Sequence, residues 1–370
     1  ISGAVVQTTS FVYRKNKHLN YRSTFIKLTA YQSQNEKERA FLEHPQKDVF
    51  ITTIEKLKKI EGLPFSYWAS DACLAAFNKP SLIGLTISDG QNKTGDNDVY
   101  LRKHWEVNDK KIGVDRKWLF YAKGGAYRKW VGNLTEIIDW SSEARSHYRA
   151  DPSCRILKEA LWYKQGITWG VIAQIGFRVL PCDATFDMQG SSVFISNEDD
   201  YYSILAFLNT KVAYDFLQVF NITLSFQIRD IRNLPYDRTL TNKHKAVIDQ
   251  IAKSCIVLSS ADWDSFETSR DYKVHPLVAN GMFVGFPENA SHISIGSIKD
   301  SWNLWKTIAL KRFHALKANE EELNRIFIDI YGLQDELTPE VEDKDVSVRR
   351  ADLGREIRSL ISYAVGCMFG

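Results

Sequence analysis

The spacing of hydrophobic residues along this chain alternates between helical and strand-like periods, and the clearest helical pattern covers residues 201–220. Apolar residues recur there at every third or fourth position: Leu205, Leu208, Val212, Phe216 and Val219. This spacing predicts a helix with one buried face. Ile222, Leu224 and Phe226 then alternate with polar residues, which predicts a strand before Pro235.

Beyond residue 238 the pattern becomes helical. In the segment 242–258 one stripe contains Val247, Ile251, Cys255 and Leu258. A second helix is expected near residue 300, with Asp300 or Ser301 as its N-cap. Its apolar stripe comprises Trp305, Ile308, Phe313, Leu316, Leu323, Phe327 and Ile330.

The polar segment "KANEEE" leaves two readings of this second stripe open. The segment either divides two antiparallel core helices or lies within one protruding rod of about 45 Å. The following stretch, "QDELTPEVEDKDVSVRR", is expected to be a charged, exposed connection before a last helix.

Strand patterns are shorter. The segments 4–14 and 21–31 are rich in β-branched and aromatic residues and flank the polar stretch "KNKHLN", which predicts a pair of strands. Because two strands alone are marginally stable in water, they are expected to complete a sheet that lies mostly before residue 1. "SVFIS", residues 192–196, predicts another strand.

Length and composition narrow the class of protein. The 370 residues are enough for two or three folding units, and 44% hydrophobic and 25% charged residues are ordinary globular values. No apolar run reaches the length of a membrane span, no signal peptide is recognisable, and the five cysteines are scattered. These features predict a reduced, cytoplasmic protein with no membrane partner. The two ends of the sequence predict that the chain is a fragment of a longer protein.

Positive charge is concentrated in the segment 102–132. Nine lysines and arginines stand there against three acids, a local +6 in a chain of net charge +3, and six of the ten tryptophans fall between Trp105 and Trp169. Cations that neutralise phosphates, mixed with aromatic rings that stack on bases, are typical of nucleic-acid binding. Gly124 and Gly125 would let the backbone approach a phosphate. The alternative is a solvated basic face with the tryptophans in the core.

The polar stretch 88–102 is expected to be a loop that leads into a strand at 99–101. A calcium loop counted from Asp96 would need Gly and Glu where Leu101 and Val107 stand, so calcium is excluded. Asx turns at Asp96, Asn97 and Asp98 are the simpler reading.

Catalytic and metal motifs are missing from the sequence. It has no Gly-Lys dipeptide of a P-loop and no HExxH, CxxC or GxSxG motif. No two prolines are adjacent and no glycine-rich cofactor loop follows a strand, so no catalytic, cofactor-binding or metal-binding residue is assigned. A dispersed Ser, His and Asp constellation stays open.

Several segments, in order, resemble the target-recognition region of combined adenine-specific DNA methyltransferases. The residues that carry the resemblance are "TGDNDVYLR", "KWLFYAKGGAYRKWVGN", "IDW", "QGITWGVI", "FDMQGSSVF", "LAFLNTKVAYDFLQ" and "SFQIRDIRNLP". The similarity is strongest to the adenine methyltransferases of type 1 bacteriophage-exclusion (BREX) systems. It extends through "LPFSYWASDACLAAF", "DWDSFETS" and "LNRIFIDIYGL", and therefore covers nearly the whole chain.

This resemblance implies a mixed α/β chain in four parts. Residues 1–45 would be the last strands of the methyltransferase domain and 46–238 an α+β target-recognition domain. Residues 239–335 would form a helical scaffold, and 336–370 a charged connection with the start of a further helix. The family transfers a methyl group from S-adenosylmethionine to the N6 atom of adenine with an Asn-Pro-Pro-Tyr loop. That loop is absent here, so the chain alone is expected to bind no cofactor and to be inactive.

A methyltransferase that extrudes its target base needs another domain to hold the duplex. Lys123, Arg128 and Lys129 are the expected contacts to phosphate or guanine. The further candidates for DNA contact are Thr94, Asn97, Arg102, Gly124, Gly125, Tyr127, Thr168 and Gln189. Tyr127 and Trp130 could equally be core residues.

The expected partners are double-stranded DNA, other BREX proteins and phage proteins that mimic DNA. One alternative function is the specificity part of a restriction-modification enzyme. The other is an aromatic-rich module that binds sugars.

Overall fold

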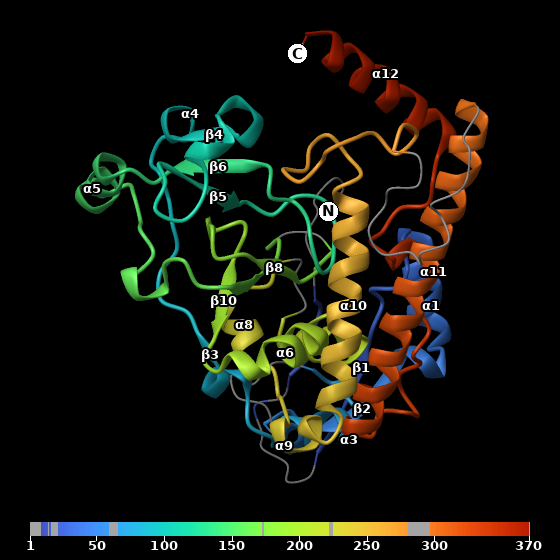
Figure 1. Cartoon of the computed structure of the whole chain (residues 1–370). Helices are drawn as coiled ribbons and strands as arrows, with labels where there is room; N and C mark the ends of the chain where they lie inside the picture. The colour runs from blue at the N-terminus through green and yellow to red at the C-terminus, as the bar shows by residue number, and fades with distance from the viewer. Residues whose placement is uncertain are drawn as a thin grey trace. The chain divides into compact units, whose positions relative to one another are not determined.

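The computed structural model describes residues 9–13, 15, 21–58, 66–171, 174–221, 225–279 and 297–369 (Figure 1). The chain divides into two compact units, Ile1–Ser70 and Asp71–Gly370. Both helices and small sheets are present, so the predicted mixed α/β class is confirmed.

The first unit contains a two-stranded antiparallel sheet, β1 (Arg22–Ile26) with β2 (Val49–Thr53). Helices α1 (Gln34–Glu43) and α2 (Ile54–Leu57) complete its regular structure. The expected pairing of 21–31 with 4–14 is wrong where it is described: residues 9–13 form no strand, and β1 pairs with β2. Residues 4–8 and 14 lie outside the described residues.

The second unit contains two four-stranded sheets. The first is antiparallel and has the order β3 (Thr86–Ile87), β10 (Ser192–Ile195), β7 (Gly166–Thr168), β8 (Arg178–Leu180). The second has the order β4 (Leu101–Lys103), β6 (Glu136–Asp139), β5 (Trp118–Ala122), β9 (Ala184–Phe186). The strand predicted at 192–196 is therefore confirmed as β10.

Strand β5 is the centre of the second sheet because its sequence, "WLFYA", is apolar on both faces. All five of its residues are buried. Trp118, Phe120 and Ala122 pack into one hydrophobic cluster, and Leu119 and Tyr121 pack into another. β5 pairs with β6 antiparallel and with β9 parallel, through Phe120 opposite Ala184.

Ten helices of the second unit are described: α3 (Asp71–Ala76), α4 (Asn97–Tyr100), α5 (Ser142–Ala150), α6 (Tyr201–Leu208), α7 (Lys211–Phe220), α8 (Ile228–Arg232), α9 (Arg238–Asn242), α10 (Lys245–Trp263), α11 (Ile298–Tyr331) and α12 (Leu353–Phe369). The long helices α10 and α11 lie side by side (Figure 1). None of the described helices combines the length and apolar character needed to cross a membrane.

The helix predicted at 201–220 has the expected buried stripe but is two helices, α6 and α7. The break falls at Thr210, whose side chain accepts a hydrogen bond from the N–H of Ala213 and so caps α7. Thr210 also donates its hydroxyl to the Phe207 carbonyl (2.6 Å), which turns the chain at the end of α6. Of the strand predicted next, residues 222–224 lie outside the described residues, and the chain is helical from Ile228.

The stripe predicted on α10 is confirmed at Cys255, whereas the other buried residues differ from the predicted ones. The buried residues are Ile248, Ala252, Cys255, Ser259 and Asp262, whereas Val247 is 50% exposed. The apolar spacing did not find the end of this face because Ser259 and Asp262 are polar and pair with Arg128 and with carbonyls of the same distant loop.

Helix α11 runs unbroken for 34 residues, so the antiparallel pair of helices is wrong. It is no protruding rod either, since α10, α7 and α6 pack against it. Ser297, rather than Asp300 or Ser301, is its N-cap and accepts the Asp300 N–H. "KANEEE" does not interrupt the helix because Glu320 is buried and accepts hydrogen bonds from other segments.

The connection after α11 is less exposed than its charge predicts. Val341, Val346 and Val348 are buried, and Arg349 pairs with Asp262 of α10. The apolar residues of "VEDKDVSV" anchor a segment whose acidic side chains face solvent. The last helix begins as expected, at Leu353.

Candidate nucleic-acid interface

The cations of the basic segment 102–132 have several carboxylate partners. Five of the nine form ion pairs: Lys103 and Lys123 with Glu136, Lys117 with Asp139, Arg128 with Asp262, and Lys129 with Glu320. Much of the local excess of positive charge is thus compensated by acids from other parts of the fold.

Arg128 points into the protein. Its guanidinium lies 2.8 Å from Asp262 at the end of α10 and stacks on the Trp263 ring, with 5.1 Å to the ring centroid. Its Nε donates to the Val131 carbonyl, and the residue is 5% exposed. The geometry gives Arg128 a role in joining the loop after β5 to α10.

Lys129 and Trp130 attach the same loop to α11. The Lys129 ammonium lies 2.9 Å from one Glu320 oxygen, and the Trp130 indole N–H donates to the other oxygen at 2.8 Å. Burial alone would lower the pKa of Lys129, but the Glu320 carboxylate outweighs it, so the pKa is raised and the residue is charged. Tyr127 donates its hydroxyl to the Asp345 carbonyl. Glycine is needed at Gly176, where a Cβ would lie 2.3 Å from the Arg128 carbonyl.

Other predicted contacts come together in a group of three loops, 123–125, 168–171 and 187–191, which we call the loop cluster. Thr168 donates its hydroxyl to the Gly190 carbonyl (2.9 Å), and the N–H of Val171 donates to the Gln189 carbonyl (3.1 Å). Gly124 has a left-handed φ of +86°, and a Cβ there would lie 3.1 Å from that same carbonyl.

Asp187 organises the turn within the loop cluster. One of its oxygens accepts the N–H groups of Gln189 and Gly190 at 2.7 and 3.0 Å. Burial raises the pKa of Asp187, while these hydrogen bonds and the Lys123 ammonium oppose the rise. Gln189 and Gly125 are exposed and Lys123 is half-buried, so these three reach the surface.

Thr94, Asn97 and Arg102 lie apart from the loop cluster: Thr94 precedes α4, Asn97 begins α4 and Arg102 is in β4. Thr94 is buried and donates to the Asn97 side chain (2.7 Å), and Arg102 donates to the Asp98 carbonyl (2.8 Å). The Asx reading is confirmed at Asp96, which caps α4 by accepting the N–H groups of Asp98 and Val99. The strand expected at 99–101 starts later, at Leu101, because this cap makes residues 97–100 helical.

A groove with a cavity volume of about 530 Å³ was not predicted from the sequence. Its lining includes Arg155, Arg229 and Arg232 with Ser88 and Gln91, and none of its lining residues is acidic. Arg232 is held by the Thr86 carbonyl (3.0 Å), whereas Arg229 is exposed on the first turn of α8. The signal was present as "IRDIR", which places two arginines three apart on one helix face.

The geometry bears on two alternative functions, sugar binding by tryptophans and catalysis by a Ser, His and Asp constellation. Of the six tryptophans between 105 and 169, Trp118, Trp130, Trp140 and Trp169 are buried, so they offer no surface for stacking on sugars. Among the described residues, His275 lies 3.1 Å from Ser359, but its Nδ1 accepts the Leu277 N–H instead of facing a carboxylate. This pair is therefore no catalytic triad.

The fold is mixed α/β, and the groove is lined by arginines. Comparison with known proteins shows which proteins the chain is similar to. No family model matches the chain. Over its whole length, however, the chain is homologous to part of proteins named as adenine-specific methyltransferases, which confirms the resemblance found in the motifs.

Two curated relatives define this similarity. Adenine-specific methyltransferase PglX of Lacticaseibacillus casei (strain Zhang) is 36% identical over 393 residues, covering 100% of this chain and 32% of that protein. Adenine-specific methyltransferase BrxX of Escherichia coli O9:H4 (strain HS) is 30% identical over 397 residues, covering 100% of this chain and 31% of that protein. The chain spans about a third of the length of these relatives.

Proposed function

We propose that this chain is the DNA target-recognition and scaffold part of a site-specific adenine-N6 DNA methyltransferase that acts in BREX phage defence and host-DNA modification. The observation that carries the proposal is the similarity of the whole chain to adenine-specific methyltransferases. The loop cluster and the arginine-lined groove support it, because cations and exposed polar side chains on glycine-bearing loops suit a duplex.

Within this proposal the groove and the loop cluster have different tasks. Arg229 and Arg155 contact phosphates, together with Lys123 of the loop cluster. Gln189 and Asn97, whose side chains are exposed, are the candidates for hydrogen bonds to base edges. Arg128, Lys129 and Tyr127 hold the loop in place from inside and act on DNA only indirectly.

The S-adenosylmethionine that the whole methyltransferase would use does not fit the groove of this chain. The sulfonium of that cofactor is a cation, and the groove is lined by three arginines with no carboxylate to accept ribose hydroxyls. The sequence also has no two adjacent prolines for the base-gripping loop. We place cofactor and catalysis outside these residues.

The partners that follow are double-stranded DNA and the other proteins of a BREX system. A phage protein that mimics DNA would present an acidic surface, and the same arginine-lined groove would attract it. Competition between such an inhibitor and a duplex for this chain would be the expected behaviour.

Fluorescence anisotropy with a mixed-sequence duplex, titrated in salt, tests the proposal. Binding should weaken steeply as salt rises. Arg229→Ala should make the slope of log affinity against log salt less steep, by about one. Arg116→Ala is the matched control, since this arginine is exposed like Arg229 but does not line the groove. Wild-type binding that does not respond to salt, or equal effects of both variants, would contradict the proposal.

A further inference from the structure

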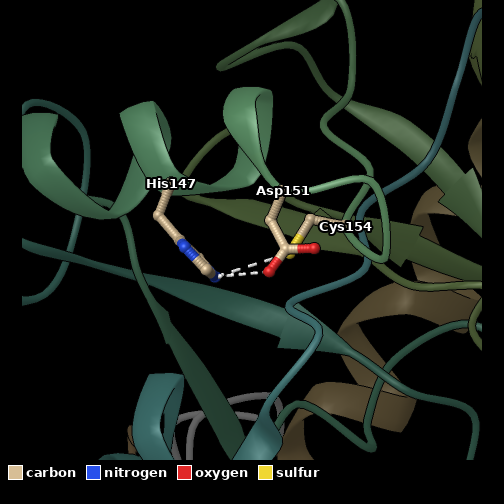
Figure 2. Close-up of side chains that lie close together, drawn as sticks. All are labelled: His147, Asp151 and Cys154. Carbon is tan, nitrogen blue, oxygen red and sulfur yellow. Dashed lines mark hydrogen bonds and ion pairs between the residues drawn. The ribbon is translucent and has the colours of Figure 1, made fainter.

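A cluster of three potential metal ligands lies apart from the groove, at the end of α5. His147 is in the last turn of that helix, Asp151 is its C-cap, and Cys154 follows three residues later (Figure 2). His147 Nε2 lies 3.5 Å from Cys154 Sγ and 3.9 Å from an Asp151 oxygen. All three ligand atoms lie within 4.8 Å of one another.

The local fold holds these side chains together without a metal. The carbonyl of His147 accepts the Asp151 N–H (3.0 Å), and the carbonyl of Asp151 accepts the Cys154 N–H (3.0 Å), so the chain turns back over the helix end. The His147 ring stacks on Tyr100 at 4.9 Å between centroids. One Asp151 oxygen accepts the Ser153 N–H (2.7 Å), and the other faces His147.

The separation of the His147 nitrogen from the Cys154 sulfur matches a tetrahedral ion. With Zn–N near 2.0 Å, Zn–S near 2.3 Å and a tetrahedral angle, the N-to-S separation is roughly 3.5 Å. The separation found here is 3.5 Å. The carboxylate must move by roughly half an ångström to reach its own ideal separation from nitrogen. The side chains of His147 and Asp151 are 35% and 37% exposed, so the site is open to an ion.

We propose that His147, Asp151 and Cys154 bind one zinc ion, with water as the fourth ligand. A nitrogen, a sulfur and a carboxylate oxygen suit zinc, whereas calcium and magnesium prefer all-oxygen sites. On binding, the Cys154 thiol proton leaves to solvent and a sulfur–zinc bond forms. The thiol then no longer donates to the Thr94 carbonyl, which lies 3.0 Å away in the metal-free geometry.

The ion would join the end of α5 to the turn that follows it, since all three ligands come from residues 147–154. Cys154 Sγ touches the loop that begins at Thr94, and a Cβ on Gly95 would lie 2.8 Å from that sulfur. The loop that presents Asn97 packs against this sulfur, so the ion would fix the turn against which that loop packs. This role is structural and does not depend on the proposed DNA binding.

Titration of the chain with Zn²⁺ and with Co²⁺, after chelator treatment and with thiols reduced, tests this site. The wild type should bind one equivalent, and bound Co²⁺ should show the near-ultraviolet absorption of a thiolate ligand. Cys154→Ser and His147→Gln should each lower affinity at least about 100-fold, since even partners of metal ligands contribute 10- to 100-fold. Cys182→Ser, which removes an exposed cysteine elsewhere, should bind as the wild type does.

Absence of tight binding by the wild type, or retention of it in Cys154→Ser, would overturn the proposal. Cys154 is buried, so thermal unfolding of the metal-free variant must first match the wild type. If it does not, His147→Gln decides the question, because this side chain is half-exposed and its replacement is expected to leave the fold intact, which thermal unfolding of that variant checks. Unchanged Zn²⁺ affinity in His147→Gln would then reject the site.

Discussion

Arg128 and Asp262 form a buried ion pair that joins the loop after β5 to α10. Asp262 also accepts the Arg349 N–H and lies 3.4 Å from the Arg349 guanidinium, so one carboxylate serves two arginines. Removing one partner of a buried pair leaves an uncompensated charge, which costs several kcal/mol.

We therefore expect Arg128→Ala to lower the free energy of unfolding by about 3 kcal/mol, at the lower end for buried pairs because Arg349 still neutralises Asp262. Urea denaturation measures the change. Arg116→Ala is the control, and it should change stability by less than about 0.5 kcal/mol because Arg116 is exposed. Equal stability of the two variants would show that the ion pair contributes little.

His275 gives the stability of the chain a dependence on pH. The residue is 1% exposed, its Nδ1 accepts the Leu277 N–H and its Nε2 faces Ser359. Burial lowers the pKa of His275, and the Glu356 carboxylate opposes that shift. The folded state thus favours the neutral ring, whereas the unfolded chain takes up the proton first as pH falls.

This histidine's contribution is present above about pH 6.5 and is lost as pH falls from there towards its folded pKa. Wild-type stability should decrease over that window, and His275→Gln should decrease less. Denaturation midpoints at several pH values measure both. His314→Gln, on the exposed side of α11, should keep the wild-type dependence. Parallel curves for wild type and His275→Gln would argue against this role.

At the scale of elements, the loop cluster depends on a close backbone contact at Gly190. A Cβ at this position would lie 2.1 Å from the Ala122 carbonyl, and a backbone atom at the end of β5 cannot move aside. Gly190→Ala should therefore lower the free energy of unfolding by about 1–3 kcal/mol or more.

Gly84→Ala is the matched control because no atom lies within 4 Å of its added Cβ. It should be neutral or stabilise by up to about 1 kcal/mol, through the loss of unfolded-state entropy. Chemical denaturation of the two variants side by side makes the comparison. If Gly190→Ala is as stable as Gly84→Ala, the loops are not locked by this contact.

Sequence periodicity predicted elements where apolar residues determine burial, as in β10 and α6. It failed where polar residues are buried with distant partners. Asp262 and Glu320 look like surface acids in the sequence, yet they pair with Arg128 and Lys129, which are 134 and 191 residues away. The same pairs explain why the "YRKW" run looked like a binding surface: its charge is complementary to helices that local sequence cannot place beside it.

The loop cluster was anticipated in part, since Lys123, Gly124, Gly125, Thr168 and Gln189 were predicted contacts and lie together. The groove was not anticipated, because residues 83–91, 155–156 and 228–233 are brought together by the bridge between Lys93 and Arg155 and by the packing of α8. Tertiary structure of this kind leaves no local signal beyond the arginine spacing in α8.

At the scale of the whole molecule, the net charge of +3 is too small to attract DNA by itself, so binding depends on where uncompensated cations lie. Lys123 in the loop cluster and Arg229 on α8 belong to different segments and share no contact among the described residues. If one duplex touches both, each releases counterions independently.

The double variant Lys123→Ala with Arg229→Ala should therefore reduce the steepness of the slope of log affinity against log salt by about two. This is the sum of two single effects of about one each. Salt titrations by anisotropy of wild type, both single variants and the double variant measure this. Arg128→Lys, which keeps the charge inside the protein, should leave the slope unchanged even if stability falls. If the double variant binds DNA no more weakly than the single variants, only one of the two surfaces contacts the duplex. The other cation then contacts only its own surroundings, which are Glu136 for Lys123 and solvent for Arg229.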